Sequence, residues 1–238
     1  MTRLICLEPD HPGEAWAQFT GVRPLAELRA GVWRIRERWA GVLGVEDVAV
    51  MGSHITGFVD VDSAPVLAPG PVIGPAVVVR SDFAPAGAAL ELDPAVRRLV
   101  HEEATVGWIV PDGERWDGPS ESGPAEAVEG MLLQGAWDLV TALEHFLAPD
   151  CADALTAGSD PVPDGAIVLG DPGDAACFGA VVEPGVLFDV RHGVVVLEEG
   201  AEVHSGTRLE GPLFVGPGSI ILGGAVRHSV IGPHCRVH

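Results

Sequence analysis

The 238-residue chain carries 34 acidic and 14 basic residues, which gives a formal net charge of −20 at pH 7. Such a negative field repels phosphate backbones and anionic lipids, so it excludes general binding to nucleic acids and to membrane surfaces. No apolar run approaches the ~18 residues of a membrane span, and the first residues lack the basic flank and apolar stretch of a signal peptide. We therefore expect a soluble, cytoplasmic protein.

All 14 basic residues are arginine, and the chain contains no lysine. P-loop enzymes and pyridoxal-phosphate enzymes need a lysine in their sites, so both classes are excluded. Any phosphate would have to be held by arginine or by backbone N–H groups. The four cysteines, Cys6, Cys151, Cys177 and Cys235, lie far apart without a Cys-x-x-Cys pair, which indicates neither a zinc site nor a redox pair. We expect all four to be buried, unreactive thiols.

The first part of the chain mixes strand and helix patterns. Buried strands are predicted at residues 2–7, 47–51 and 72–79, where apolar and β-branched residues follow one another. Over residues 25–43 an apolar side chain recurs every three or four positions, which predicts an amphipathic helix. Gly44 follows directly, as is typical of a helix end.

Two further helices are predicted in the same part of the chain. Asp93 and Pro94 suit the N-cap and the first position of a helix over residues 93–103. A longer apolar segment predicts a helix over residues 125–147 that ends before Pro149.

The segment between these two helices, residues 112–124, is rich in Gly, Pro, Ser and acidic residues, which predicts a surface loop. Strands that alternate with helices favour a mainly parallel sheet covered by helices. We therefore predict a Rossmann-like α/β domain over residues 1–165.

From about residue 166 an aliphatic side chain recurs at every sixth position: Leu197, Val203, Leu209, Val215 and Ile221. Small or apolar residues follow four positions later: Ala201, Thr207, Leu213, Ser219 and Ala225. A six-residue period is typical of a parallel β-helix, in which each hexad supplies one short strand and inward aliphatic side chains stack. An ordinary β-sandwich would instead alternate with period two and turn every 8–12 residues. We predict a β-helix over residues 166–238, with Val215 stacked between Leu209 and Ile221.

Three stretches of the chain resemble the GlmU-like sugar nucleotidyltransferases. They are FTGVRPLAELRAG at 19–31 with IRERW at 35–39 behind it, AWDLV at 136–140, and LEGPLFVG at 209–216. The resemblance implies a nucleotidyltransferase-like α/β domain over residues 1–165, followed by a short left-handed β-helix over residues 166–238. It also implies a homotrimer that forms through the β-helix.

This resemblance implies transfer of a nucleotidyl group from a nucleoside triphosphate to a sugar-1-phosphate, with release of pyrophosphate. The family's Lys-Pro-Leu motif corresponds here to Arg23, Pro24 and Leu25. Arg23 is therefore the expected catalytic and nucleotide-binding residue, with Arg29 as a second nucleotide-binding residue; a surface ion pair is the alternative role of Arg23. The family's Gly-rich phosphate loop corresponds to residues 8–13, whose prolines and carboxylates make a poor phosphate cradle.

The resemblance also implies a magnesium ion. Asp82 follows a buried strand, as the family's metal-binding aspartate does, and Asp138 is the expected second ligand. The alternative for Asp82 is a turn aspartate that caps the segment after it. The alternative for Asp138 is a solvated or locally hydrogen-bonded carboxylate within the helix predicted over residues 125–147.

Two other functions remain open. One is a non-catalytic, trimer-forming module whose α/β domain has lost its phosphate loop. The other is acyl transfer, because His192 and His204 lie at edge positions where this family places a general base, although both are also typical of surface corners. The hexads stop in mid-repeat at His238, so we expect the chain to be the front part of a longer bifunctional protein. Acetyl-CoA would bind only in the further coils of such a protein.

Overall fold

The computed structural model describes residues 2–87, 89–156 and 158–238. The chain divides into two compact units, Met1–Leu139 and Val140–His238. This division falls before the change of pattern at residue 166, close to which the first strand of the second unit begins. Among the described residues, no helix combines the length and the apolar character needed to cross a membrane.

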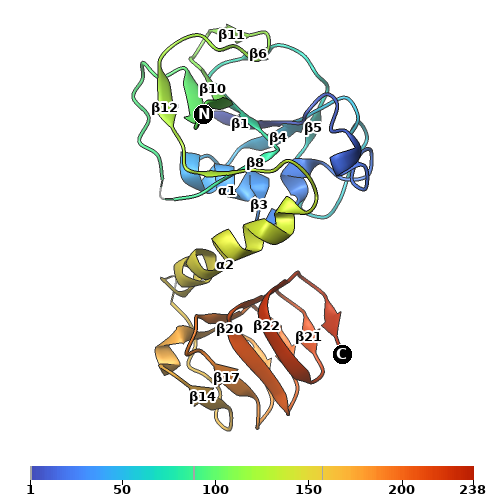
Figure 1. The fold of residues 1–238 in the computed structure, drawn as a ribbon, viewed down its shortest axis with the longest axis vertical. Helices are drawn as coiled ribbons and strands as arrows, with labels where there is room; N and C mark the ends of the chain where they lie inside the picture. The colour runs from blue at the N-terminus through green and yellow to red at the C-terminus, as the bar shows by residue number, and fades with distance from the viewer. Residues whose placement is uncertain (1, 88, 157) are drawn as a thin grey trace. The chain divides into compact units, whose positions relative to one another are not determined.

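A seven-stranded sheet forms the centre of the first unit, in the order β12-β9-β10-β7-β1-β4-β5 (Figure 1). Its strands are β1 (Arg3–Leu7), β4 (Val48–Met51), β5 (Val66–Leu67), β7 (Ala76–Arg80), β9 (Arg98–His101), β10 (Ala104–Val110) and β12 (Ala125–Ala127). Parallel pairing joins β7, β1, β4 and β5, whereas β10 runs antiparallel to both of its neighbours. The predicted mixed α/β class with parallel sheets is confirmed.

Three two-stranded pairs and short helices complete this unit. The pairs join β2 (Arg29–Ala30) to β3 (Trp33–Arg34), β6 (Val72–Ile73) to β11 (Arg115–Trp116), and β8 (Phe83–Pro85) to β13 (Gly130–Leu132). The helices are η1 (Glu14–Trp16), η2 (Leu25–Glu27) and α1 (Ile35–Leu43).

Apolar side chains pack on the sheet of the first unit. Ile5, Val78 and Trp108, from the neighbouring strands β1, β7 and β10, belong to one buried cluster. Elsewhere in this unit, the indole of Trp39 on α1 packs against Phe83, with ring centroids 5.6 Å apart. Burial of these large side chains, which are 5% exposed or less, holds α1 and the strands together.

The predicted helix over residues 25–43 is only partly correct. Its second half forms α1, which ends at Gly44 in a left-handed conformation with φ 63°. Its first half instead forms the short helix η2 and the β2–β3 hairpin, with Gly31 at φ 71° in the turn between these strands. The apolar spacing therefore reflects burial on several elements rather than one continuous helix.

The helix predicted over residues 93–103 is wrong. Asp93 does accept a hydrogen bond from the backbone of Ala95 at 2.7 Å, but the turn that it caps is followed by strand β9. A tight turn, in which Glu102 has φ 52°, returns the chain into β10. The ladder between β9 and β10 satisfies the backbone groups that a helix would have paired internally.

The helix predicted over residues 125–147 begins thirteen residues late, because α2 spans Asp138–Thr156 and contains Pro149. The residues before it form β12 and β13. At Gly130 an added Cβ would lie 2.3 Å from the carbonyl oxygen of Ala84, so a glycine permits the close pairing of β13 with β8. Pro149 does not end the helix, contrary to the prediction.

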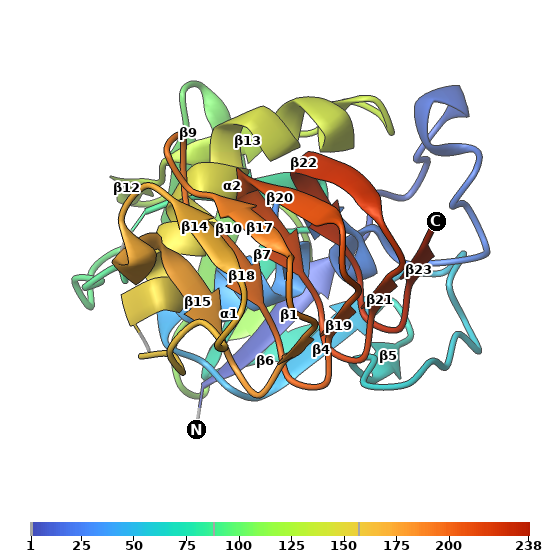
Figure 2. The same cartoon turned by 90° about the horizontal axis from the view of Figure 1, so that it is seen from below.

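In the second unit, short strands follow α2. They are β14 (Ile167–Leu169), β15 (Ala175–Cys177), β16 (Val181–Val182), β17 (Leu187–Asp189), β18 (Val195–Leu197), β19 (Glu202–Val203), β20 (Thr207–Val215), β21 (Ile220–Ile221), β22 (Gly224–Ile231) and β23 (Arg236–Val237), with the short helix η3 (Pro172–Asp174) between β14 and β15. Every pairing among these strands is parallel, and it repeats in three ladders. Figure 2 shows the strands of successive circuits side by side.

The five hexad positions from Leu197 to Ile221 are fully buried, so the predicted inward register is correct. Their stacking partners differ from the prediction. Val215 pairs with Leu197 and Ile231, not with Leu209 and Ile221, because one circuit contains about three hexads. Among the residues four positions later, Ala225 is exposed, and Val226 is buried in its place.

Three of the four cysteines are buried as expected, and all four are free thiols. Burial raises the pKa of Cys6, of Cys151 to about 12 and of Cys177 to about 11. Cys235 is exposed, because it lies in the turn between the last two strands, so the expectation of four buried thiols is wrong at this position.

Candidate functional site

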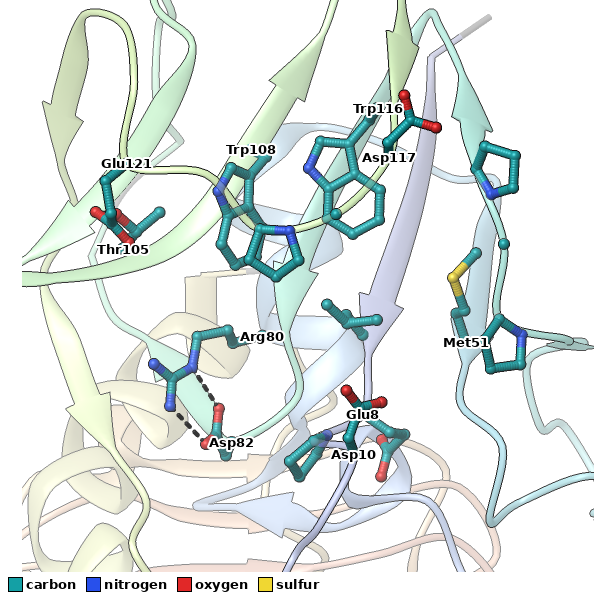
Figure 3. A pocket seen from close by; sticks show the side chains of 17 residues that line it. Glu8, Asp10, Met51, Arg80, Asp82, Thr105, Trp108, Trp116, Asp117 and Glu121 are labelled. Atoms are coloured by element: carbon teal, nitrogen blue, oxygen red, sulfur yellow. Dashed lines mark hydrogen bonds and ion pairs between the residues drawn. The ribbon is translucent and has the colours of Figure 1, made fainter.

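A cavity of about 540 Å³ lies at the carboxyl ends of three parallel strands, where Leu7, Met51 and Arg80 line it (Figure 3). In the strand order, β4 and β5 lie on one side of β1, and the chain then crosses over to form β7 on the other side of β1. Open α/β sheets bind their ligands outside the carboxyl ends of the strands, at such a reversal of strand order. This cavity is therefore the candidate site.

Two indoles form one wall of the cavity. Trp108 on β10 and Trp116 on β11 have ring centroids 5.8 Å apart and planes tilted by 48°. The indole Nε of Trp108 donates to the carbonyl of Ser120 at 2.8 Å, which fixes its ring. Prolines line the cavity as well: Pro9, Pro69, Pro71 and Pro119. An apolar wall of flat rings suits a ligand that itself contains a ring.

Arg80 and Asp82 form a two-point ion pair at the edge of this cavity (Figure 3). Arg80 Nε donates to Asp82 Oδ1 at 2.8 Å, and Nη2 donates to Oδ2 at 2.7 Å. The hydrogen bond to Asp82 raises the pKa of Arg80. The indole of Trp39 donates to the carbonyls of Arg80 at 3.2 Å and Phe83 at 3.1 Å, so the backbone on both sides of the pair is anchored to α1.

Two other carboxylates that line the cavity, Glu121 and Asp117, have arginine partners. Glu121 Oε2 accepts from Arg98 Nη1 at 2.9 Å and from the hydroxyl of Thr105 at 2.6 Å. Asp117 Oδ1 accepts from Arg115 Nε at 2.7 Å. These pairs reduce the negative field that the sequence alone suggests for this part of the chain.

Glu8 follows β1 at the place where a nucleotidyltransferase would have its phosphate loop. Its side chain is fully buried. Its two carboxylate oxygens accept hydrogen bonds from the backbone N–H groups of Leu25 at 2.9 Å and Ala26 at 3.1 Å. The Glu8 side chain therefore holds the segment after Arg23 against β1. Two backbone N–H groups in this region are occupied by a carboxyl group of the chain itself.

His54 lies beside this carboxylate, with 3.7 Å between its Nε2 and Glu8 Oε2. Burial raises the pKa of Glu8, although its backbone hydrogen bonds act in the opposite direction. Burial also lowers the pKa of His54, against an opposing effect of Asp10. Desolvation thus favours the uncharged form of both side chains.

The structure does not bring the two predicted nucleotide-binding arginines to this cavity. Arg23 forms an ion pair with Asp60, its guanidinium lies 5.6 Å from the ring centroid of Phe58, and both partners of the ion pair are partly exposed. Arg29 donates from Nη1 to the carbonyl of Val32 within the β2–β3 hairpin. Neither arginine lines the cavity. Arg23 takes the surface ion-pair role that the sequence left as its alternative.

The two predicted metal ligands are both engaged in local hydrogen bonds. Both oxygens of Asp82 accept from Arg80. Asp138 lies at the start of α2, where Oδ2 accepts from the backbone N–H groups of Gln134 at 2.6 Å and Gly135 at 3.2 Å. Within residues 2–87, 89–156 and 158–238, no three His, Cys, Asp or Glu side chains are grouped to hold a metal ion. As arranged, these side chains do not fit magnesium, and we assign no step to it.

The two histidines of the acyltransferase hypothesis lie in the second unit. His204 is 3.9 Å from Glu183 through Nδ1 and 4.0 Å from Glu202 through Nε2, with its side chain 38% exposed. His192 is exposed in the turn after β17. Both positions are turns between strands, as expected from the hexad pattern.

Sequence reasoning missed several residues that form the cavity. Trp116 lies in the segment predicted as a surface loop, which contains β11 and lines the cavity between residues 116 and 121. Trp108 belongs to the apolar run of β10, whose β-branched residues are the signal that could have identified a strand. Arg80 directly follows a predicted strand, but the cation at that position was given no role.

A scan against models of known protein families gave no match to this chain, and a search of curated proteins gave none either.

Proposed function

We propose that the first unit is a nucleotidyltransferase-like domain that binds a sugar phosphate in the cavity at the carboxyl ends of β1, β4 and β7. The proposed activity is transfer of a nucleotidyl group from a nucleoside triphosphate to a sugar-1-phosphate. The observation that carries the proposal is the position of this cavity, at the carboxyl ends of parallel strands where the strand order reverses.

The walls of the cavity support a ligand with both a ring and an anionic group. Trp116 is half-buried and is backed by the buried ring of Trp108, so together they form an apolar wall against which a sugar or a base can pack. Arg80 supplies a guanidinium, which binds phosphate through two parallel hydrogen bonds. Arg80 therefore takes the phosphate-binding role that the sequence had suggested for Arg23.

We further infer that the strands from Ile167 to Val237 form a left-handed β-helix through which the chain trimerises. The three parallel ladders support a β-helix, and the handedness and the trimer follow from the resemblance to GlmU-like proteins. Light scattering of the purified chain tests the trimer. A mass near 74 kDa, three times the 24.7 kDa of one chain, is expected, and a mass near 25 kDa would refute it.

The second candidate is a trimer-forming module without nucleotidyl transfer. The specific observation in its favour is that Asp82, Asp138 and Arg23 are all engaged by neighbouring groups. A domain with this arrangement could bind a sugar phosphate in the same cavity without reacting it.

Pyrophosphate release distinguishes the two candidates. The full chain would be incubated with each of the four common nucleoside triphosphates, a panel of hexose-1-phosphates and 5 mM Mg²⁺. The transferase predicts release that depends on both substrates and falls in Arg80→Gln. A folded protein that releases no pyrophosphate with any pair, but still binds a sugar phosphate, would refute transfer and support the binding module.

A further inference from the structure

The Arg80–Asp82 ion pair separates two cavities of the first unit. Besides the cavity of about 540 Å³, a second cavity of about 190 Å³ is lined by His11, Trp16 and Gln134, among others. Pro9, Arg80 and Asp82 line both cavities. A ligand in either space would therefore meet this ion pair.

Arg80 is the only arginine among the described residues that line either cavity. Its side chain is 33% exposed and that of Asp82 is 16% exposed, so solvent reaches the guanidinium. Both hydrogen bonds to Asp82 come from one edge of the guanidinium, through Nε and Nη2. This edge presents the two parallel donors that also bind a phosphate group.

We propose that the Asp82 carboxylate is an internal substitute for a phosphate group of the ligand. On binding, the phosphate would take the paired position on Arg80, and Asp82 would turn away into solvent. Asp82 then competes with the ligand, which is the opposite of the metal-binding role that the sequence suggested. The identity of the ligand as a sugar phosphate rests on the proposed function, whereas the competition does not require catalysis.

The geometry around the pair favours such an exchange. The indole of Trp39 donates to the backbone carbonyl of Arg80 at 3.2 Å, so the backbone that carries the guanidinium stays anchored when Asp82 leaves. Asp82 lies in the short turn between β7 and β8, and its two carboxylate oxygens each accept a hydrogen bond from Arg80. The exchange therefore replaces one anion by another on the same two donors.

Equilibrium titration of the full chain with glucose 1-phosphate in EDTA tests the proposal, read by calorimetry. Asp82→Asn removes the competing charge and should tighten binding about five- to tenfold. Arg80→Gln, alone or combined with Asp82→Asn, should lose at least tenfold in affinity. Glucose, which has no phosphate, should bind all four proteins equally, and inorganic phosphate should follow the same order as glucose 1-phosphate if the phosphate alone suffices.

Asp47→Asn is the matched control. Asp47 accepts from Arg3 Nε at 2.8 Å at the opposite end of β1, so the change removes the same charge beside an arginine outside the cavity. Its affinity for glucose 1-phosphate should stay within about twofold of the parent chain, which separates local competition from the overall field. Circular dichroism checks that each variant is folded, and Asp82→Ser replaces Asp82→Asn if the latter is not.

The proposal is overturned if Asp82→Asn binds glucose 1-phosphate no more tightly than the parent chain in EDTA. A loss of affinity in Asp82→Asn that appears only with Mg²⁺ would instead support the metal-binding role. Both outcomes are independent of pyrophosphate release, so failure of this proposal and failure of nucleotidyl transfer can be told apart.

Discussion

Leu197 and Val215 lie three hexads apart in the sequence and are paired neighbours on the parallel strands β18 and β20. Both side chains are fully buried in the core of the second unit. Ile231 on β22 lies on the other side of Val215. The inward stack is thus built from residues one circuit apart. Because the stacked side chains are aliphatic and buried, a charge placed among them would have no partner.

Val215→Asp should destabilise the second unit by more than about 3 kcal/mol, because it places an unpaired carboxylate among aliphatic side chains. Urea unfolding followed by circular dichroism measures the loss. Val181, which is 60% exposed at the start of β16, provides the matched control. Val181→Asp should cost less than about 1 kcal/mol. Equal losses at the two positions would contradict the observed register.

The hexad pattern predicted which side chains point inward, because one buried aliphatic side chain recurs at every sixth residue. It did not predict which of them stack, because the number of hexads in a circuit depends on the turns. The circuits here shorten along the chain: Val181 pairs with Glu202, which pairs with Ile220, which pairs with Arg236. Ala225 is exposed because one of these turns has lost residues relative to a regular repeat.

Cys235 should be the one thiol that reacts quickly in the folded protein. Cys235 is exposed. Burial raises the pKa of each of the other three thiols and also shields these thiols from reagents. Ellman's reagent should therefore titrate about one equivalent under native conditions and four in urea. In Cys235→Ser the fast equivalent should disappear. Two or more fast equivalents in the parent chain would contradict the burial of Cys6, Cys151 and Cys177.

Glu8 should make the stability of the first unit depend on pH. Because burial raises its pKa in the folded chain, the folded state holds this proton more tightly than the unfolded state. The resulting stabilisation is fully present below the unfolded pKa of about 4.5 and is lost as the pH rises through the higher folded pKa.

Glu8→Gln removes this titration and leaves the other titratable side chains in place. The free energy of unfolding of the parent chain, relative to that of Glu8→Gln, should therefore fall as the pH rises from 4.5 to 8. Urea titrations of both proteins at four pH values measure the difference. A difference that stays constant or rises over this range would show that the pKa of Glu8 is not raised.

Arg23→Gln should leave the affinity for glucose 1-phosphate within about twofold of the parent chain. The guanidinium of Arg23 pairs with Asp60 at the surface and does not line the cavity, so a ligand bound there should not contact it. Calorimetric titration of Arg23→Gln and Arg80→Gln with glucose 1-phosphate compares their affinities directly. A tenfold loss of affinity in Arg23→Gln would instead support the nucleotide-binding role that the sequence suggested for Arg23.

The candidate site was less predictable than the hexads. Buried strands over residues 2–7 and 47–51 were recognised from their composition, and they place Leu7 and Met51 at the cavity. The motif around Arg23 suggested a phosphate contact, but the side chain turns to Asp60, a loop residue far along the chain. Asp82 was expected to bind a metal because it follows a buried strand, as the metal-binding aspartate of GlmU-like proteins does. No sequence rule shows that Arg80, two residues earlier, pairs with both of its oxygens.

The central claim is that a ligand binds in the cavity at the carboxyl ends of β1, β4 and β7, and amide chemical-shift mapping tests it most directly. The isotope-labelled 238-residue chain would be titrated with glucose 1-phosphate in EDTA. We predict that the perturbed amides cluster at residues that line the cavity: Leu7, Glu8, Asp10, Arg80, Asp82, Trp116, Asp117, Gly118 and Glu121. Perturbations that cluster instead around Arg23 and residues 56–60, or no perturbation at millimolar ligand, would contradict the account.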